Sequence, residues 1–148
     1  MARKQSSPGQ ADPLNLRDYG VVFATFSSLE AITEGDAVYV NTSSYIGRAQ
    51  ANASSTMQAI GVAQRGILSG QPGRVITGGR KSTSNYSFSG FHGRQGYVST
   101  GSAGGVQTTP PTSSGQVSQV LGFIADQTTL FVQPQRTWQV GGSLNVIG

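Results

Sequence analysis

The chain has 148 residues, with 21 glycines, no cysteine, 10 basic residues and only 6 acidic residues. The absence of cysteine excludes a disulfide scaffold, a thiolate metal site and a cysteine nucleophile, and the single histidine makes a histidine metal site or a Ser–His triad hard to build. Valine, isoleucine, threonine and glycine are common while glutamate, lysine and leucine are scarce, which predicts an all-β protein.

The net charge of +4 reflects a shortage of acids. The basic residues are spread along the chain and form no stripe, so we expect no direct contact with nucleic acid. There is no run of 18 apolar residues, which predicts no membrane-spanning segment. The first eight residues contain no apolar stretch, so we expect no secretory signal.

Residues 1–18 are predicted to form an extended N-terminal arm, because Pro8, Gly9 and Pro13 interrupt any regular structure. Such an arm becomes ordered only when it contacts something outside its own domain. The candidate partner contacts in this arm are its basic residues and the two leucines near its end: Arg3, Lys4, Leu14, Leu16 and Arg17.

Short apolar runs bounded by Gly, Pro, Asn, Ser or Thr follow, and they predict a small antiparallel barrel or sandwich. The expected strands are residues 21–24, 37–40, 59–63, 74–76, 96–98, 120–124 and 130–132. Tyr86 and Phe88 alternate with serines in a further strand-like segment. Residues 27–32 have the only helix-like signal, a serine ahead of an acid, and are too short to form a helix alone.

An internal repeat divides this β domain, residues 19–133, into two pseudo-repeated halves at about 35–79 and 94–133. Tyr39 and Val40 match Tyr97 and Val98 at an offset of 58 residues, and the segment around Gly61 matches that around Gly122 at an offset of 61. A glycine inside a strand predicts a bulge or a close backbone approach.

Residues 134–148 are predicted to be a C-terminal tail. It holds the only tryptophan and ends in alternating apolar and polar residues, a pattern typical of a strand that adds to a neighbour's sheet. The candidate partner contacts in the tail are Trp138, Leu144, Val146 and Ile147.

No catalytic, metal or cofactor residue is expected. The closest acids, Glu34 and Asp36, could form an acid–base pair, but two solvated acids that shape a turn are the favoured interpretation. Asp126 is predicted to cap a turn, and His92 to lie at the surface or in an interface. The glycine-rich residues 101–105 lack the lysine and helix of a phosphate site, which favours a plain loop.

Aromatic and basic residues alternate between Tyr86 and Arg94, a pattern that could stack single-stranded nucleic acid. Because aromatic rings are usually buried, we expect Tyr86, Phe88 and Phe91 to belong to the core instead.

Several segments together resemble a pattern widespread in tailed-bacteriophage virion proteins. They are GDAVYVN at 35–41, AIGVA at 59–63, GRVITGG at 73–79, GYVS at 96–99, TTPP at 108–111 and VLGFIA at 120–125. Similar stretches occur in head-decoration (cement) proteins and in parts of tail fibres and spikes. The resemblance covers residues 30–134 and leaves the tail after Pro134 unexplained. It implies a compact β-barrel or β-tulip domain that trimerises on the capsid and uses terminal arms to clasp capsid proteins.

The first hypothesis is therefore a non-enzymatic decoration protein, a homotrimer that binds the major capsid protein on the outer surface of the virion after assembly in the host cytoplasm. The second is a tail-fibre, spike or baseplate component that binds a host surface glycan or receptor through Tyr45, Tyr86 and Trp138. The third, a wall or glycan hydrolase, requires two carboxylates about 5 to 9.5 Å apart and is disfavoured by the shortage of acids.

Overall fold

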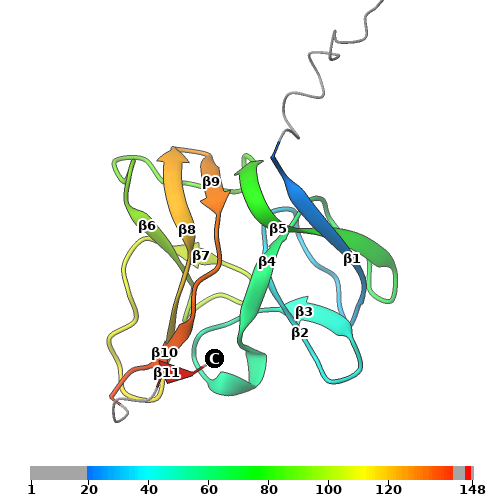
Figure 1. Cartoon of the computed structure of the whole chain (residues 1–148), viewed down its shortest axis with the longest axis horizontal. Helices are drawn as coiled ribbons and strands as arrows, with labels where there is room; N and C mark the ends of the chain where they lie inside the picture. Colours follow the sequence, from blue (N-terminus) through cyan, green and yellow to red (C-terminus); the bar gives the residue numbers. More distant parts are fainter. Residues whose placement is uncertain (1–19, 142–145, 148) are drawn as a thin grey trace, which may run out of the picture.

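The computed structural model describes residues 20–141 and 146–147, which form eleven β-strands and one 3₁₀ turn, Ser54–Thr56 (Figure 1). The described residues contain no α-helix, so the prediction of an all-β protein is confirmed. The strands are β1 Val22–Ser28, β2 Ala37–Val40, β3 Tyr45–Arg48, β4 Ala59–Ala63, β5 Pro72–Ser82, β6 Gln95–Val98, β7 Val106–Gln107, β8 Val117–Asp126, β9 Thr129–Val132, β10 Thr137–Gln139 and β11 Val146–Ile147.

The first half is a closed five-stranded barrel in the order β1-β3-β2-β4-β5, and β5 pairs back with β1 to close it. The β1–β3 pair is parallel and the other pairs are antiparallel. The barrel interior is filled by a small apolar cluster: Ile32, Val38, Ile46, Ala63, Ile67 and Val75. Closure removes the free sheet edges of this half.

The second half has the strand order β7-β6-β8-β9-β5, and the last four residues of β5 pair with β9. The long strand β5 therefore belongs to both halves. Among the described residues β7 pairs only with β6, so the second half is an open copy of the barrel. The Tyr86–Phe88 segment, expected to be strand-like, forms no strand, because its two rings pack 4.9 Å apart into the core of this half.

The predicted repeat is visible in the strand pairing. Val38 pairs with Gly61 and Gly96 pairs with Gly122, and the register shifts immediately after each pair. A Cβ atom on Gly61 would lie 2.0 Å from the carbonyl oxygen of Ile76, and one on Gly122 would lie 2.0 Å from that of Phe131. Only glycine allows these approaches, so the expected close contact at both glycines is confirmed.

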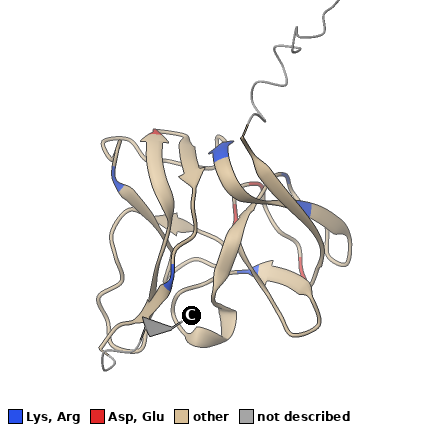
Figure 2. Ribbon diagram, viewed as in Figure 1, with Lys and Arg blue, Asp and Glu red and all other residues tan. Residues whose placement is uncertain are grey.

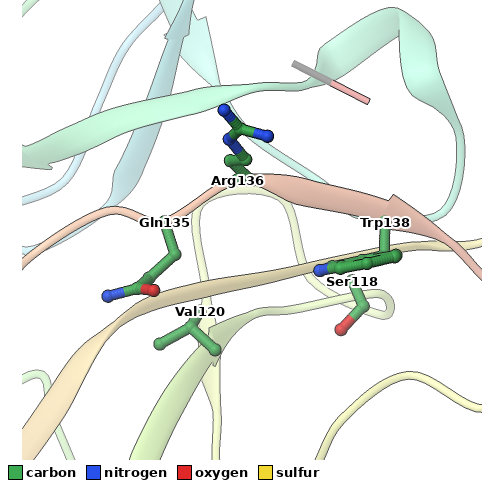
Figure 3. A pocket seen from close by; sticks show the side chains of 5 residues that line it. All are labelled: Ser118, Val120, Gln135, Arg136 and Trp138. Carbon is green, nitrogen blue, oxygen red and sulfur yellow. The ribbon is translucent and has the colours of Figure 1, made fainter. Parts of the chain in front are cut away.

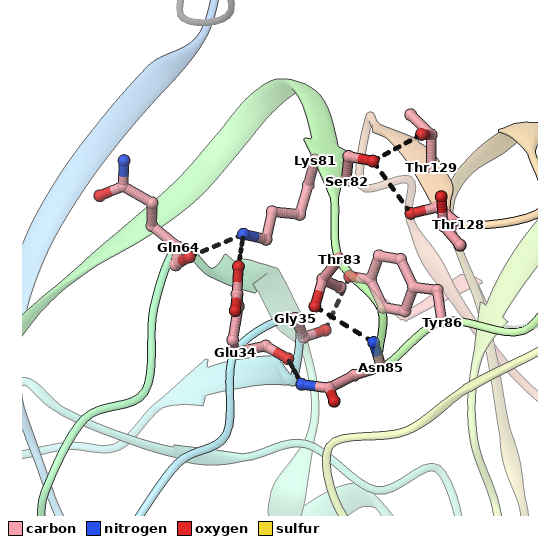
Figure 4. Close-up of polar contacts among 10 residues, drawn as sticks. All are labelled: Glu34, Gly35, Gln64, Lys81, Ser82, Thr83, Asn85, Tyr86, Thr128 and Thr129. Atoms are coloured by element: carbon pink, nitrogen blue, oxygen red, sulfur yellow. Dashed lines mark hydrogen bonds and ion pairs between the residues drawn. The ribbon is translucent and has the colours of Figure 1, made fainter.

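The two halves are joined by a cluster of polar contacts at the end of β5 (Figure 4). Lys81 Nζ lies 2.5 Å from Glu34 Oε2 and donates to the Gln64 carbonyl oxygen at 2.7 Å. The Tyr86 hydroxyl donates to the Gly35 carbonyl oxygen at 2.7 Å. The turn at residues 33–36 of the barrel thus holds the segment that opens the second half.

A second link uses Gln119, a buried residue of β8. Its side-chain amide accepts a hydrogen bond from the backbone N–H of Ala59 and donates to the carbonyl oxygen of the same residue, both at 2.9 Å. A primary amide can do this because it carries both a donor and an acceptor. The Gln119 side chain therefore supplies hydrogen-bond partners for the N–H and carbonyl groups of β4 that face the second half.

Residues 27–32, which carry a helix-like signal but are too short to form a helix alone, form none: Ser27 and Ser28 end β1 and Ile32 bridges to Ile67. The part of the tail that is described adds a strand to this chain's own sheet, and the predicted addition to a neighbour's sheet stays a prediction. Thr137–Gln139 pair with the first three residues of β8, which extend beyond β9 and leave backbone groups for a strand to bind.

Candidate functional site

One face of each half carries an equivalent row of side chains, and the two rows differ in exposure. Each row consists of Cα partners on four adjacent strands. In the first half the row is Ala37, Val62, Ile76 and Phe23. In the second half the row is Gln95, Phe123, Phe131 and Arg80.

The first row lies on the outside of the barrel and is covered by the second half. Its neighbours in sequence, such as Val38 and Val75, point into the barrel, and side chains alternate between the two faces of a strand. Val62 and Ile76 belong to the main core together with Leu121 and Leu130 of the second half. The outside of the first half is therefore an internal interface of the protein.

The second row is exposed. Phe123 and Phe131 are 41% and 42% exposed, and their rings stack with centroids 5.0 Å apart and planes 12° apart. Gln95 and Arg80 at the two ends of the row are exposed as well. Large apolar side chains that gather on a surface mark interaction sites more often than scattered ones do. We call this surface the outer face of the second half.

The outer face continues along β8 toward Trp138, which pairs with Ser118 and is 51% exposed. A depression of about 310 Å³ lies there (Figure 3). Its lining residues come from β8, from the segment leading into β10 and from β10 itself: Ser118, Val120, Gln135, Arg136 and Trp138. The Gln135 N–H donates to the Val120 carbonyl oxygen at 2.9 Å, which holds this segment against β8.

The charges on the surface are few and mostly basic (Figure 2). Among residues 20–141, two ion pairs form, Glu30 with Arg48 and Glu34 with Lys81. The remaining basic side chains of this range make no ion pair within it: Arg65, Arg74, Arg80, Arg94 and Arg136. Two of them, Arg80 and Arg136, border the outer face, so a partner there would meet positive charge.

The acids in the described range all make contacts that shape the fold. Glu34 and Asp36 flank Gly35 as expected, but they are not simply solvated. Glu34 pairs with the buried Lys81, and Asp36 accepts a hydrogen bond from the Thr33 N–H at 2.9 Å. Asp126 accepts from the Thr128 N–H at 2.9 Å, which confirms its role as a turn cap.

The pKa values of two aspartates shift in opposite directions. Loss of hydration raises the pKa of Asp36, because the loop at residues 101–105 packs against it, and the bond from Thr33 opposes the shift. The Thr128 backbone hydrogen bond lowers the pKa of Asp126. Burial raises the pKa of the Tyr86 hydroxyl far above its ordinary value.

Among the predicted contact residues, the structure describes Trp138 in full and places Val146 and Ile147 in β11, paired with β10. Arg3, Lys4, Leu14, Leu16, Arg17 and Leu144 lie outside the described residues. Of the proposed ligand platforms, Tyr45 and Trp138 are exposed, but Tyr86 is buried and is wrong as a platform. Tyr86 and Phe88 are core residues, as expected from their aromatic character, and His92 lies at the surface.

The exposed pair Phe123 and Phe131 was not among the candidates. Both lie in predicted strands, and a strand pattern alone does not say whether a face is covered. The repeat carries a usable signal: phenylalanines replace the smaller Val62 and Ile76 at equivalent positions.

Comparison with protein-family models, curated proteins and solved structures finds no match. The described part of the chain holds no helix long and apolar enough to cross a membrane. Within that same part, no three His, Asp or Glu side chains converge as metal ligands would.

Proposed function

We propose that this chain is a non-enzymatic structural protein of a tailed-phage virion, which decorates and stabilises the capsid by binding the major capsid protein. The motifs at residues 35–41, 59–63 and 120–125 resemble those of head-decoration proteins. The observation that carries the proposal is the exposure of Phe123 and Phe131 on the outer face of the second half. The equivalent face of the first half is buried as an internal interface, so we expect the exposed face to be a contact surface as well. Its role is adhesion between proteins, and it requires no turnover.

The shape of the body supports attachment at several points. The described chain begins at one end of the molecule, and β11 lies at the opposite end (Figure 1). Sequence before Gly20 and after Ile147 therefore starts from well-separated places. Several weak contacts made together give strong attachment when the geometry permits them all. In this proposal the protein acts as a homotrimer on the outer surface of the capsid.

The direct test mixes the purified protein with expanded capsids that lack it. The proposal expects saturable binding and additional density at the local three-fold axes. Failure to bind, together with a monomer in solution, contradicts it. Phe123→Ser, Phe131→Ser and Trp138→Ala should each weaken attachment, whereas Leu68→Ser, at an exposed leucine of the barrel, serves as the matched control.

A second candidate is a tail-fibre, spike or baseplate component that binds a host surface glycan. The observation in its favour is the depression beside Trp138, where an exposed indole lies near Arg136, Gln135 and Ser118. An aromatic platform with a few polar groups is suited to a sugar ring. Copy number separates the two functions, since a capsid protein is present in hundreds of copies per particle and a tail protein in a few to tens. Glycan binding that is lost in Trp138→Ala would favour the tail.

A further inference from the structure

The outer face of the second half combines an exposed apolar centre with positive charge at its border. Phe123 and Phe131 are 41% and 42% exposed, and the exposed Trp138 continues the apolar surface along β8. Arg80 is the Cα partner of Phe131 on the next strand, and Arg136 lies in the segment between β9 and β10. A complementary partner therefore offers apolar side chains with negative charge beside them.

The acids of the described chain do not neutralise these two arginines. Within residues 20–141, neither Arg80 nor Arg136 forms an ion pair. The pKa of Asp126 is lowered mainly by the hydrogen bond from the Thr128 N–H, and the charge of Arg80 makes the smallest contribution to that shift. A neutral partner would take water away from the guanidinium groups and replace it with nothing, whereas a carboxylate supplies a charged acceptor.

The outer face is too small to hold a second copy of this chain by itself. Its row of four strands is about 14 Å wide, and the five residues from Phe123 to Ser118 extend it by about 16 Å along β8. The footprint is roughly 220 Å², whereas each partner in a stable complex contributes about 800 Å². A symmetric contact would also bring four arginines of two copies together. A short extended segment of another protein matches this footprint.

Aromatic rings beside arginines are also typical of sites for single-stranded nucleic acid, but the arrangement differs here. Such sites combine free ring faces with a continuous basic groove. Phe123 and Phe131 stack on each other with centroids 5.0 Å apart, so one face of each ring is already covered. Arg136 follows Phe131 by five residues, which puts the two arginines about 17 Å apart along an extended chain. Two charges at that distance do not make a continuous groove.

We propose that the outer face binds a short acidic segment of a partner protein, in which apolar side chains cover Phe123 and Phe131 and a carboxylate pairs with Arg80. This inference rests on the proposed function, in which the partner is the major capsid protein, and it adds the chemistry of the contact. Val62 and Ile76, the counterparts of the two phenylalanines, are already covered by apolar side chains of another β unit. Because an exposed ion pair is screened by salt, the binding should weaken as the salt concentration rises.

Two dyes test the chemistry of the outer face on the full chain without a capsid. Anilinonaphthalene sulfonate joins aromatic rings to a negative charge, and phenylnaphthylamine is its uncharged counterpart. Arg80→Glu should weaken binding of the sulfonate dye about 5-fold and leave binding of the neutral dye within about 2-fold. Phe123→Ser with Phe131→Ser should weaken binding of both dyes about 5-fold or more.

The matched control is Arg65→Glu, which changes the net charge by the same amount. Arg65 is exposed in the loop between β4 and β5 of the first half and makes no ion pair within residues 20–141. It should leave the binding of both dyes unchanged. Arg80→Lys, which keeps the positive charge, should retain most of the binding of the sulfonate dye. Equal losses in Arg80→Glu and Arg65→Glu would overturn the inference, since they would show an effect of net charge alone.

The same variants are then tested on expanded capsids that lack the protein. Arg80→Glu should weaken attachment about 10-fold, whereas Arg65→Glu should bind like the wild type. Capsids that bind the wild type and Arg80→Glu equally would overturn the inference and leave the proposed function standing. Capsids that do not bind the wild type, with the expected dye results, would overturn the proposed function and leave the acidic preference of the face standing.

Two further outcomes would replace the partner. An oligomer of the wild type that dissociates in Phe123→Ser with Phe131→Ser would overturn the inference in favour of a second copy. Saturable binding of a labelled oligothymidylate that is lost in the same variant would overturn it in favour of nucleic acid. We expect the wild type and this variant to have the same mass in solution, and neither to bind the oligonucleotide.

Discussion

Phe123 of β8 is the structural counterpart of Val62 of β4, but Phe123 is 41% exposed whereas Val62 is fully buried. Both residues belong to rows of side chains that cross four strands of their half. The second half packs on the row that contains Val62, and no described residue packs in the same way on the row that contains Phe123. The same structural unit is therefore used once as an internal interface and once as an external surface.

This difference predicts unequal effects of truncation. Ile76→Ala should lower the free energy of unfolding by about 2 to 4 kcal/mol, because it leaves a cavity between the halves. Phe131→Ala should lower it by only about 1 kcal/mol, since it removes mainly the stacking with Phe123. Urea denaturation measures both values. Equal losses would mean that Phe131 is already buried in the free protein.

The two strand glycines predict a matched pair of severe variants. In Gly61→Ala and Gly122→Ala the new methyl group would lie 2.0 Å from a carbonyl oxygen, so the strands must move apart. Each variant should lose about 3 kcal/mol or more of stability, because overpacking displaces backbone and not only a side chain. Gly101→Ala, where no atom lies within 4 Å, is the control and should lose under about 1 kcal/mol. A mild effect at either strand glycine would refute the equivalence of the two sites.

The ion pairs should differ in their contribution to stability. The Lys81 side chain is 8% exposed and its partner Glu34 is 41% exposed, whereas Glu30 and Arg48 are each 39% exposed. Glu34→Gln removes the negative charge that compensates the buried ammonium of Lys81. It should lower the free energy of unfolding by about 1 to 2 kcal/mol, a range that already allows for the exposure of the Glu34 carboxylate. Glu30→Gln should cost less than about 1 kcal/mol. Chemical denaturation of both variants at low and high salt tests the order, and the reverse order would contradict it.

The two aspartates predict opposite pH dependences. The native pKa of Asp36 is raised above its ordinary value of 3.8, so the native state holds the proton more tightly than the unfolded state does. The contribution of this group to stability therefore falls as the pH rises from 3.8 through the native pKa. The native pKa of Asp126 is lowered, so its contribution is present above 3.8 and is lost as the pH falls through the native value.

Unfolding free energies of the wild type, Asp36→Asn and Asp126→Asn between about pH 2 and pH 7 separate the two effects. The stability of the wild type relative to Asp36→Asn should decrease as the pH rises. Its stability relative to Asp126→Asn should increase. Slopes of the same sign for both comparisons would show that one of the two assignments is incorrect.

Most of the fold could be predicted from local signals. The cores of β2, β4, β6, β8 and β9 coincide with apolar runs bounded by turn residues, and the repeat offsets place Gly61 and Gly122 at equivalent positions. Strand β3 contains Gly47 and Arg48 and has no apolar run, so only its pairing reveals it. Closure of the first half by the parallel β1–β3 pair is a long-range contact that no sequence window contains.

The candidate site was less predictable. Trp138 is exposed as expected, but its strand binds β8 of the same chain, because β8 extends beyond β9. The segments around Gly61 and Gly122 have the same apolar pattern, which gives no reason to expect one covered face and one exposed face. That distinction depends on how the halves pack together, and the packing is decided by residues far apart in the chain, such as Gln119 and Ala59.

The most direct test of the central claim is the location and number of this protein in purified phage particles, measured by quantitative mass spectrometry and electron cryo-microscopy. The account predicts hundreds of copies per particle, with density on the outer capsid surface that fits the paired barrel halves. Its absence from the capsid, or a few copies confined to the tail, would contradict the account.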